Sequence, residues 1–223
     1  MKSTETKGGR EIIFWMKKGD FVRLYFSLFP WVISSIIVVK RVDFRILLED
    51  KMNRHLHTSQ HTEIIFYKPE HKAALESFYL PEDQKQFTGM PKEMLQVALE
   101  DKHRFPVVIV SNEKPVGFFI LYDGEERFEY SDHSNSLVFR AFSINHEDQG
   151  NGHAKAALLQ LKAFTQHHFP EAEEIVLAVN LNNLPARQAY LKAGFRDDGR
   201  TKMGRNGLQH ILVLPIEKKR SCP

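Results

Sequence analysis

The sequence has very little cysteine: its 223 residues include one, Cys222, beside the C-terminal proline. A single cysteine forms no disulfide within the chain, so the disulfide framework of small secreted proteins is excluded. The thiol also lies in a short polar tail, residues 218–223, and nothing around it indicates a nucleophile. We therefore predict a chain that works in the reducing cytoplasm, without covalent thiol chemistry.

The chain also lacks a large excess of charge of either sign. The chain carries 31 Lys and Arg against 28 Asp and Glu, and its formal net charge is +3. The basic residues are scattered and form no long run, so we predict no nucleic-acid partner. The hydrophobic fraction of 42% and the charged fraction of 26% are typical of an ordinary globular protein.

The apolar run Leu24–Val39 falls short of the roughly twenty residues of a membrane-spanning helix, and Pro30 and three serines interrupt it. It also lacks the small-residue cleavage site of a signal peptide. Three interpretations stay open: a short membrane or interfacial anchor, an extra element packed on the domain, or a stretch upstream of a natural start at Met52. We predict an N-terminal extension over residues 1–61, a domain over residues 62–217, and a membrane partner only in the first case.

Metal-binding patterns are also sparse, although the chain has 11 histidines. A polar stretch contains three histidines two or four residues apart: His55, His57 and His61. This spacing is compatible with a metal cluster or with a solvated linker. No cysteine or acidic partner is arranged beside them, as a zinc site requires. The linker is the favoured interpretation, and we predict no metal site.

What the sequence does contain is a glycine-bearing loop, Gln149–Ala154, between a predicted strand and a predicted helix. The apolar run Leu137–Ile144 precedes it, and apolar residues at helical spacing follow it from Ala154 to His167. A loop at a helix start leaves backbone N–H groups free to bind an anion, and glycines let a phosphate come close. A plain tight turn is the alternative. The loop lacks the Lys-Ser/Thr of nucleotide triphosphatases and the third glycine of dinucleotide-binding folds.

Two motifs instead resemble those of the GNAT family of N-acetyltransferases. The first, Gln149-x-x-Gly152-x-Ala154, is similar to the family's Gln/Arg-x-x-Gly-x-Gly/Ala loop, which holds the pyrophosphate of acetyl-CoA. The second lies about thirty residues further on and reads Asn183-x-x-Ala186-x-x-x-Tyr190-x-x-x-Gly194-Phe195. Two motifs in the family's order are far more specific than either alone. The resemblance covers roughly Glu63 to Ile216.

The pattern of elements predicts an α+β fold built on a mixed α/β sheet of about seven strands, with helices on both faces. Hairpins join the first four strands, and the strand–helix–strand unit that follows requires parallel pairing at the centre of the sheet. The expected strands are Thr62–Tyr67, Pro106–Ser111, Val116–Tyr122, Ser136–Ile144, Ile175–Val179, Phe195–Asp198 and Gln209–Leu214. The expected helices are Pro69–Phe78, Pro91–Asp101, Ala154–His167 and Asn183–Ala193, and the stretch around Pro81–Gln84 is expected to be loop.

The resemblance implies a site for acetyl-CoA as co-substrate. Backbone groups at the end of the fourth strand would meet the pantetheine arm, and one N–H would polarise the thioester carbonyl; these residues are Phe142, Ser143 and Ile144. The loop would hold the pyrophosphate through Gln149, Gly150, Asn151, Gly152, His153 and Ala154. Tyr190 would donate a proton to the departing thiolate, because a tyrosine hydroxyl is protonated at neutral pH. Asn183 would bond the co-substrate or cap its helix, and Asn180 would bind the pantetheine arm or stabilise a turn.

We therefore predict an N-acetyltransferase that acts on a primary amine, either a small molecule such as a polyamine or an amino terminus. With no cysteine placed to carry an acyl group, direct attack in a ternary complex is expected. A non-catalytic acyl-CoA sensor or interaction module of the same fold is the alternative, and a homodimer is left open. Acidic residues in Pro81–Gln84 and Asp123–Glu129 suit a cationic amine, although exposed loops are commonly acidic. No general base is assigned among Glu100, Glu129, Tyr130 and Asp132.

Overall fold

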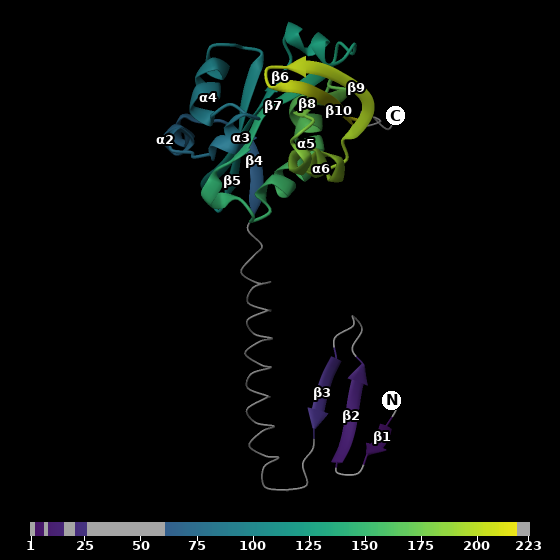
Figure 1. The fold of residues 1–223 in the computed structure, drawn as a ribbon. Coiled ribbons are helices and arrows are strands. Elements are labelled where there is room, and N and C mark those ends of the chain that lie inside the picture. Colours follow the sequence, from purple (N-terminus) through teal and green to yellow (C-terminus); the bar gives the residue numbers. More distant parts are fainter. Residues whose placement is uncertain (1–2, 7–8, 16–20, 26–60, 218–223) are drawn as a thin grey trace, which may run out of the picture. The chain divides into compact units, whose positions relative to one another are not determined.

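The computed structural model describes residues 3–6, 9–15, 21–25 and 61–217, and the chain divides into two compact units, Met1–Ser59 and Gln60–Pro223 (Figure 1). The predictions on Met52, on Cys222 and on all but the first two residues of Leu24–Val39 fall outside these ranges. Within them, no helix is long and apolar enough to cross a membrane. The first unit holds an antiparallel sheet that the sequence did not predict. Its strands are β1 (Ser3–Thr6), β2 (Gly9–Trp15) and β3 (Phe21–Tyr25).

The second unit is built on a seven-stranded mixed sheet, which confirms the predicted fold class. In sheet order its strands are β4 (Thr62–Phe66), β5 (Arg104–Ser111), β6 (Lys114–Tyr122), β7 (Ser136–Ile144), β8 (Glu174–Asn180), β10 (Gly207–Pro215) and β9 (Arg196–Gly204). Neighbouring strands are antiparallel except β7 and β8, which are parallel. The helices are η1 (Pro69–His71), α2 (Lys72–Glu76), α3 (Glu82–Lys85), α4 (Pro91–Leu99), η2 (Glu125–Glu129), η3 (His146–Asp148), α5 (His153–His168) and α6 (Leu184–Lys192).

Helices cover both faces of this sheet, and the alternation of side chains along the strands shows it. In β5, Val107 and Ile109 join one core cluster, while Val108 and Val110 join another on the opposite face. The first cluster includes Ala157, Leu158, Leu161 and Phe164, which form the buried face of α5. The second includes Leu75 of α2 and Leu95 of α4. Burial on both faces explains why β5 and β6 read as nearly continuous apolar runs.

The second unit departs from the predicted elements in three ways. A short helix, α3, lies where Pro81–Gln84 was expected to be loop. The short helices η2 and η3 lie where no helix was predicted. The last two strands are longer than predicted: β9 extends to Gly204 because it pairs with β10 along most of its length. The other described elements agree with their predicted bounds to within a few residues.

The sheet opens at its centre, where β7 and β8 separate after a short parallel ladder. Only Ser136–Val138 pair with Glu174–Val176. Further along β7, the pairing with β6 shifts register beside Ala141, which has a left-handed φ of 56°. Such a bulge bends its strand and increases the local twist. The remaining residues of β7 therefore leave β8, and backbone groups of both strands are left without partners in the sheet.

Candidate active site

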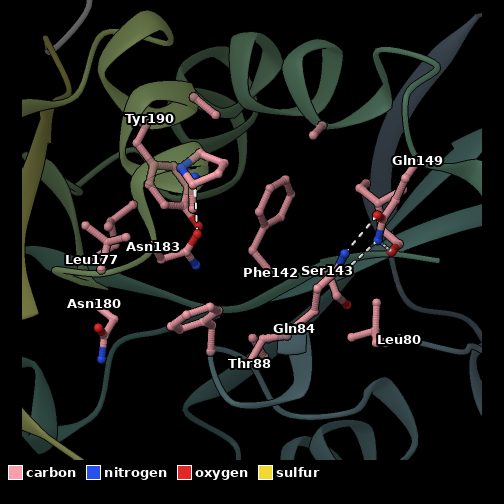
Figure 2. A pocket seen from close by; sticks show the side chains of 18 of the residues that line it. Leu80, Gln84, Thr88, Phe142, Ser143, Gln149, Leu177, Asn180, Asn183 and Tyr190 are labelled. Carbon is pink, nitrogen blue, oxygen red and sulfur yellow. Dashed lines mark hydrogen bonds between the residues drawn. The ribbon is translucent and has the colours of Figure 1, made fainter. Parts of the chain in front are cut away.

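A cavity of about 650 Å³ lies at this opening. A volume of this size is within the range of small-molecule sites. The two separating strands, the loop after β7, the start of α6 and the α3 region all contribute to its lining (Figure 2). The predicted site residues that line it are Phe142, Ser143, Ile144, Gln149, Gly150, Gly152, His153, Ala154, Asn180, Asn183 and Tyr190. Asn151 is not among the lining residues: it is exposed, and its Nδ2 donates to the Asp148 carbonyl at 3.3 Å.

The loop after β7 has the backbone that its glycines were expected to permit. Gly150 and Gly152 have φ of 79° and 84°, a left-handed conformation that favours glycine. A Cβ built on either residue would meet nothing within 4 Å, so backbone conformation, not crowding, requires glycine here. The space in front of the loop is open, and α5 begins at His153 immediately after it. The loop therefore has the form of an anion cradle at a helix start.

The side chain of His153 does not face an anion. It is 3% exposed, and its Nδ1 lies 2.9 Å from Thr62 Oγ1 at the start of β4. Burial lowers the pKa of its imidazole, with a smaller opposing effect from Asp148. A neutral, buried histidine fixes the first turn of α5 to the sheet, so any contact of His153 with an anion comes from its main chain.

Ser143 brings an unpaired polar atom to the cavity. The residue is 5% exposed, and its Oγ has no hydrogen-bond partner in the part of the chain that the structure describes. Buried hydroxyl groups are normally hydrogen-bonded. A buried hydroxyl without a partner, beside a cavity and an open glycine cradle, fits a ligand with polar groups along its length, as acetyl-CoA has. The neighbouring Phe142 packs its ring on Phe139, with centroids 5.3 Å apart.

Tyr190 lies on α6, and aromatic rings surround its side chain. Its ring centroid is 6.1 Å from that of Phe139, 6.2 Å from Phe142 and 5.6 Å from Phe195. The residue is 8% exposed, and burial raises the pKa of its hydroxyl well above the usual value. No hydrogen bond to this hydroxyl forms within the described residues. The group is therefore a protonated donor at neutral pH, held beside the cavity with no competing acceptor from the protein.

The end of α6 holds this arrangement in place. Gly194, with φ of 101°, follows the helix, and the Phe195 N–H donates to the Tyr190 carbonyl at 3.1 Å. This is a Schellman-type ending, which a left-handed glycine permits. The turn brings the Phe195 ring back against Tyr190. The Gly-Phe pair of the second motif thus has a structural role that a sequence pattern alone does not reveal.

Two asparagines near the cavity have clear structural partners. Asn183 caps α6, since its Oδ1 accepts from the Ala186 N–H at 3.3 Å. Asn180 Nδ2 donates to the Asn206 carbonyl at 2.8 Å, and its Oδ1 accepts from the Asn182 N–H at 3.1 Å. The side chain of Asn180 therefore stabilises turns at the end of β8. Its backbone remains beside the cavity.

The α3 region contributes lining residues that the sequence analysis did not select as site residues: Leu80, Asp83, Gln84, Phe87 and Thr88. The Pro81-Glu82-Asp83 sequence suits the first turn of a helix, and this was the signal available. The sequence analysis had connected this segment with the acceptor only through the acidic residues of Pro81–Gln84, which suit a cationic amine. None of the four residues considered as a general base lines the cavity; Glu129, for example, pairs with Lys202 at 2.7 Å. No cluster of His, Cys, Asp or Glu among the described residues is arranged to hold a metal ion, and His55 and His57 lie outside that part.

Comparison with known proteins agrees with this geometry. The acetyltransferase (GNAT) family model matches residues 63–195. An uncharacterised N-acetyltransferase of Bacillus subtilis (strain 168), YbbJ, is 44% identical over 155 residues, which cover 69% of this chain and 97% of that protein.

Two solved structures share the fold at low identity. The aminoglycoside acetyltransferase AAC(6')-Ib, in complex with coenzyme A and kanamycin, superposes with a TM-score of 0.57 at 18% identity, covering 69% of this chain and 94% of that one. The spermidine N-acetyltransferase of Vibrio cholerae, in complex with CoA and spermine, superposes with a TM-score of 0.54 at 16% identity, covering 72% and 98%. At these identities the likeness shows the fold alone.

The chain belongs to the GNAT acetyltransferase family, as its two motifs predicted. It is an acyltransferase of the N-acetyltransferase class, and acetyl-CoA is its co-substrate. The predicted enzyme class and co-substrate are confirmed.

Proposed function

We propose that the protein transfers the acetyl group of acetyl-CoA to a primary amine, of a small molecule such as a polyamine or of an amino terminus, by direct attack within a ternary complex. The observation that carries this proposal is the position of Tyr190. Its buried, protonated hydroxyl borders the same cavity as the glycine loop and the free end of β7. A proton donor, an anion cradle and unpaired strand backbone in one cavity are what acyl transfer from a thioester requires.

Each part has a distinct task in this proposal. The backbone N–H groups of the loop Gln149–Ala154 and the first turn of α5 hold the pyrophosphate, aided by the helix dipole. Charge-assisted hydrogen bonds of this kind contribute about 1.5–3 kcal/mol each. The main chain of Phe142–Ile144 holds the pantetheine arm, and one of its N–H groups polarises the thioester carbonyl. Tyr190 supplies a proton to the sulfur as the carbon–sulfur bond breaks, and the nitrogen releases its extra proton to water.

Asp83 supports an acceptor that carries a second positive charge. It lines the cavity, and its carboxylate has no ion pair within the described residues. The other charged lining residues are already paired: Asp148 with Lys114 at 2.9 Å, and Arg140 with Glu126 at 2.9 Å. In the second acidic stretch, Asp123–Glu129, no residue lines the cavity. We therefore place the cationic end of the acceptor at Asp83.

Thiol release from acetyl-CoA, measured with diamines, polyamines, monoamines and peptides with a free amino terminus, tests the proposal. We expect release that depends on the amine, with intersecting initial-rate lines and no acetylated enzyme by intact mass. Asp83→Asn is expected to raise KM for a diamine about fivefold, as loss of an exposed charge pair allows, and to leave KM for a monoamine of equal length unchanged. Glu82→Gln is the matched control, because Glu82 pairs with Lys85 and does not line the cavity. An equal effect of both substitutions contradicts the place given to Asp83.

A further inference from the structure

Residues 79–88, here called the α3 segment, form a wall of the cavity that the family motifs do not include. Leu80, Gln84 and Thr88 line the cavity from this segment. Figure 2 shows these three side chains along one side of the cavity, with Tyr190 and Asn183 on the other. An acceptor that reaches the thioester region therefore contacts the α3 segment. How this segment is held decides how firmly the acceptor is placed.

The segment is attached where it begins to the chain that leaves β7. The Tyr79 N–H donates to Asn145 Oδ1 at 3.1 Å, and the His146 N–H donates to the Tyr79 carbonyl at 3.0 Å. The rings of Tyr79 and His146 also meet edge to face, with centroids 5.7 Å apart. The residues that lead from β7 into the glycine loop therefore hold the start of the segment.

A reciprocal pair of amides makes a second attachment, at the first residue of the glycine loop. Gln84 Nε2 donates to Gln149 Oε1 at 3.2 Å, and Gln149 Nε2 donates to Gln84 Oε1 at 2.9 Å. Gln149 Nε2 also donates to the Ile144 carbonyl at 2.9 Å. Gln149 thus joins the last residue of β7, the glycine loop and the α3 segment. Figure 2 shows the two glutamines facing one another.

The far end of the segment is connected to the end of β8 by hydrogen bonds through Asn206. Asn206, in the turn between β9 and β10, donates from Nδ2 to the Gln86 carbonyl. Asn180, the last residue of β8, donates in turn to the Asn206 carbonyl at 2.8 Å. The α3 segment therefore bridges the cavity opening, with two attachments on the β7 side and one on the β8 side.

We propose that Gln84 is a positioning residue for acyl transfer. Its amide pair with Gln149 couples the α3 segment to the glycine loop, so that the two move and become ordered together. The inference rests on the proposed function, since it takes the loop to bind acetyl-CoA and the segment to bind the acceptor. A ligand that orders the glycine loop then orders the segment as well, and each ligand raises the affinity of the other by the same factor. Gln84 acts through Gln149 and needs no contact with either substrate.

The test is the affinity of the full chain for CoA, measured by calorimetry with and without a saturating acceptor. CoA carries no acetyl group, so both ligands can be present without turnover. We expect the acceptor to tighten CoA binding at least threefold, and this factor to fall to about one in Gln84→Ala, because both bonds of the pair are lost. Gln84→Glu keeps an acceptor for Gln149 Nε2 and is expected to give an intermediate factor. If the alanine variant does not fold, Gln84→Glu provides the test in its place.

Gln160→Ala is the matched control. Gln160 is a half-buried glutamine whose Nε2 donates to the carbonyls of Thr62 at 2.7 Å and Ala156 at 3.1 Å, and it does not line the cavity. It should lower Tm to a similar degree and leave the coupling factor unchanged, which separates positioning from general loss of stability. A coupling factor that survives in folded Gln84→Ala, or a factor of one in the wild type, overturns the inference. A wild-type chain that binds no CoA overturns the proposed function itself.

Discussion

At the scale of single residues, the Tyr190 hydroxyl is the group on which the proposed mechanism depends most. Three aromatic rings and the turn at Gly194 hold it beside the cavity, and burial raises its pKa. A raised pKa keeps the hydroxyl protonated through neutral and moderately alkaline pH. The group is thus available as a proton donor over the whole range in which an amine loses its own proton and becomes a nucleophile.

Tyr190→Phe should remove the proton donor and keep the ring. The phenyl group retains the contacts with Phe139, Phe142 and Phe195, so acetyl-CoA affinity should change by no more than about twofold. We expect kcat to fall by about 10²–10⁴, the usual contribution of a positioned general acid, as measured by thiol release. Tyr130→Phe is the control, because that hydroxyl lies outside the cavity lining. Wild-type kcat in Tyr190→Phe would show that another group, or water, protonates the thiolate.

Some of these residues could be predicted from the sequence, and others could not. The place of Tyr190 and Gly152 beside one cavity was predictable because each belongs to a motif of fixed spacing. Asp83 belongs to an acidic stretch that the sequence connected with a cationic amine, but its place in the cavity lining depends on the fold. The role proposed for Gln84 follows from a contact between segments distant in sequence, the Gln84–Gln149 pair, 65 residues apart. No local pattern indicates such a pair. The structural role of Asn180 was hidden for the same reason, since its bond to the Asn206 carbonyl depends on the turn between β9 and β10.

At the scale of elements, the loop between β7 and α5 requires glycine for two reasons: a left-handed backbone and space for a phosphate to approach. Substitutions at two different glycines can separate these reasons. Gly152 has a left-handed φ and faces open space in the cavity; Gly199, in β9, has a φ of 85° and also faces open space, away from the cavity lining. Alanine costs about 1–2 kcal/mol of backbone strain at either position. Only at position 152 does the added methyl group occupy the predicted approach of a phosphate.

Gly152→Ala should therefore weaken acetyl-CoA binding at least tenfold, while Gly199→Ala leaves it unchanged. The two variants should lose similar amounts of thermal stability, since the strain is the same. Calorimetric titration and a melting curve of each variant give both quantities. An equal effect of the two substitutions on affinity would mean that the loop does not approach the co-substrate.

The strands and helices were mostly predictable from the residue pattern, whereas only the family resemblance implied free backbone groups at the end of β7. β7 has its predicted bounds, Ser136–Ile144, because a buried apolar run between turn residues defines a strand. The left-handed Ala141 and the separation of β7 from β8 have no such signal, since alanine is rarely left-handed and register depends on both strands. α3 is too short, at 4 residues, for a helical period to appear. The cavity therefore depends on features that periodicity does not report.

At the scale of the whole molecule, the chain consists of two compact units, and the family match falls within the second. We propose that residues 62–217 form the catalytic domain and that residues 1–61 are an extension to it. A natural start at Met52 and a cytoplasmic location stay predictions. Both parts of the proposed site, the glycine loop and Tyr190, lie within residues 62–217, so the extension should not alter acetyl-CoA affinity.

The central claim is that the cavity between β7 and β8 holds acetyl-CoA, with its pyrophosphate on the glycine loop. Calorimetric titration of the wild-type chain with acetyl-CoA and with acetylpantetheine, which lacks the pyrophosphate, tests this most directly. We predict that acetyl-CoA binds and that acetylpantetheine binds at least tenfold more weakly, since the charge-assisted bonds to the loop are lost. Equal affinity for the two compounds, or no binding of acetyl-CoA at high micromolar concentration, would contradict the account.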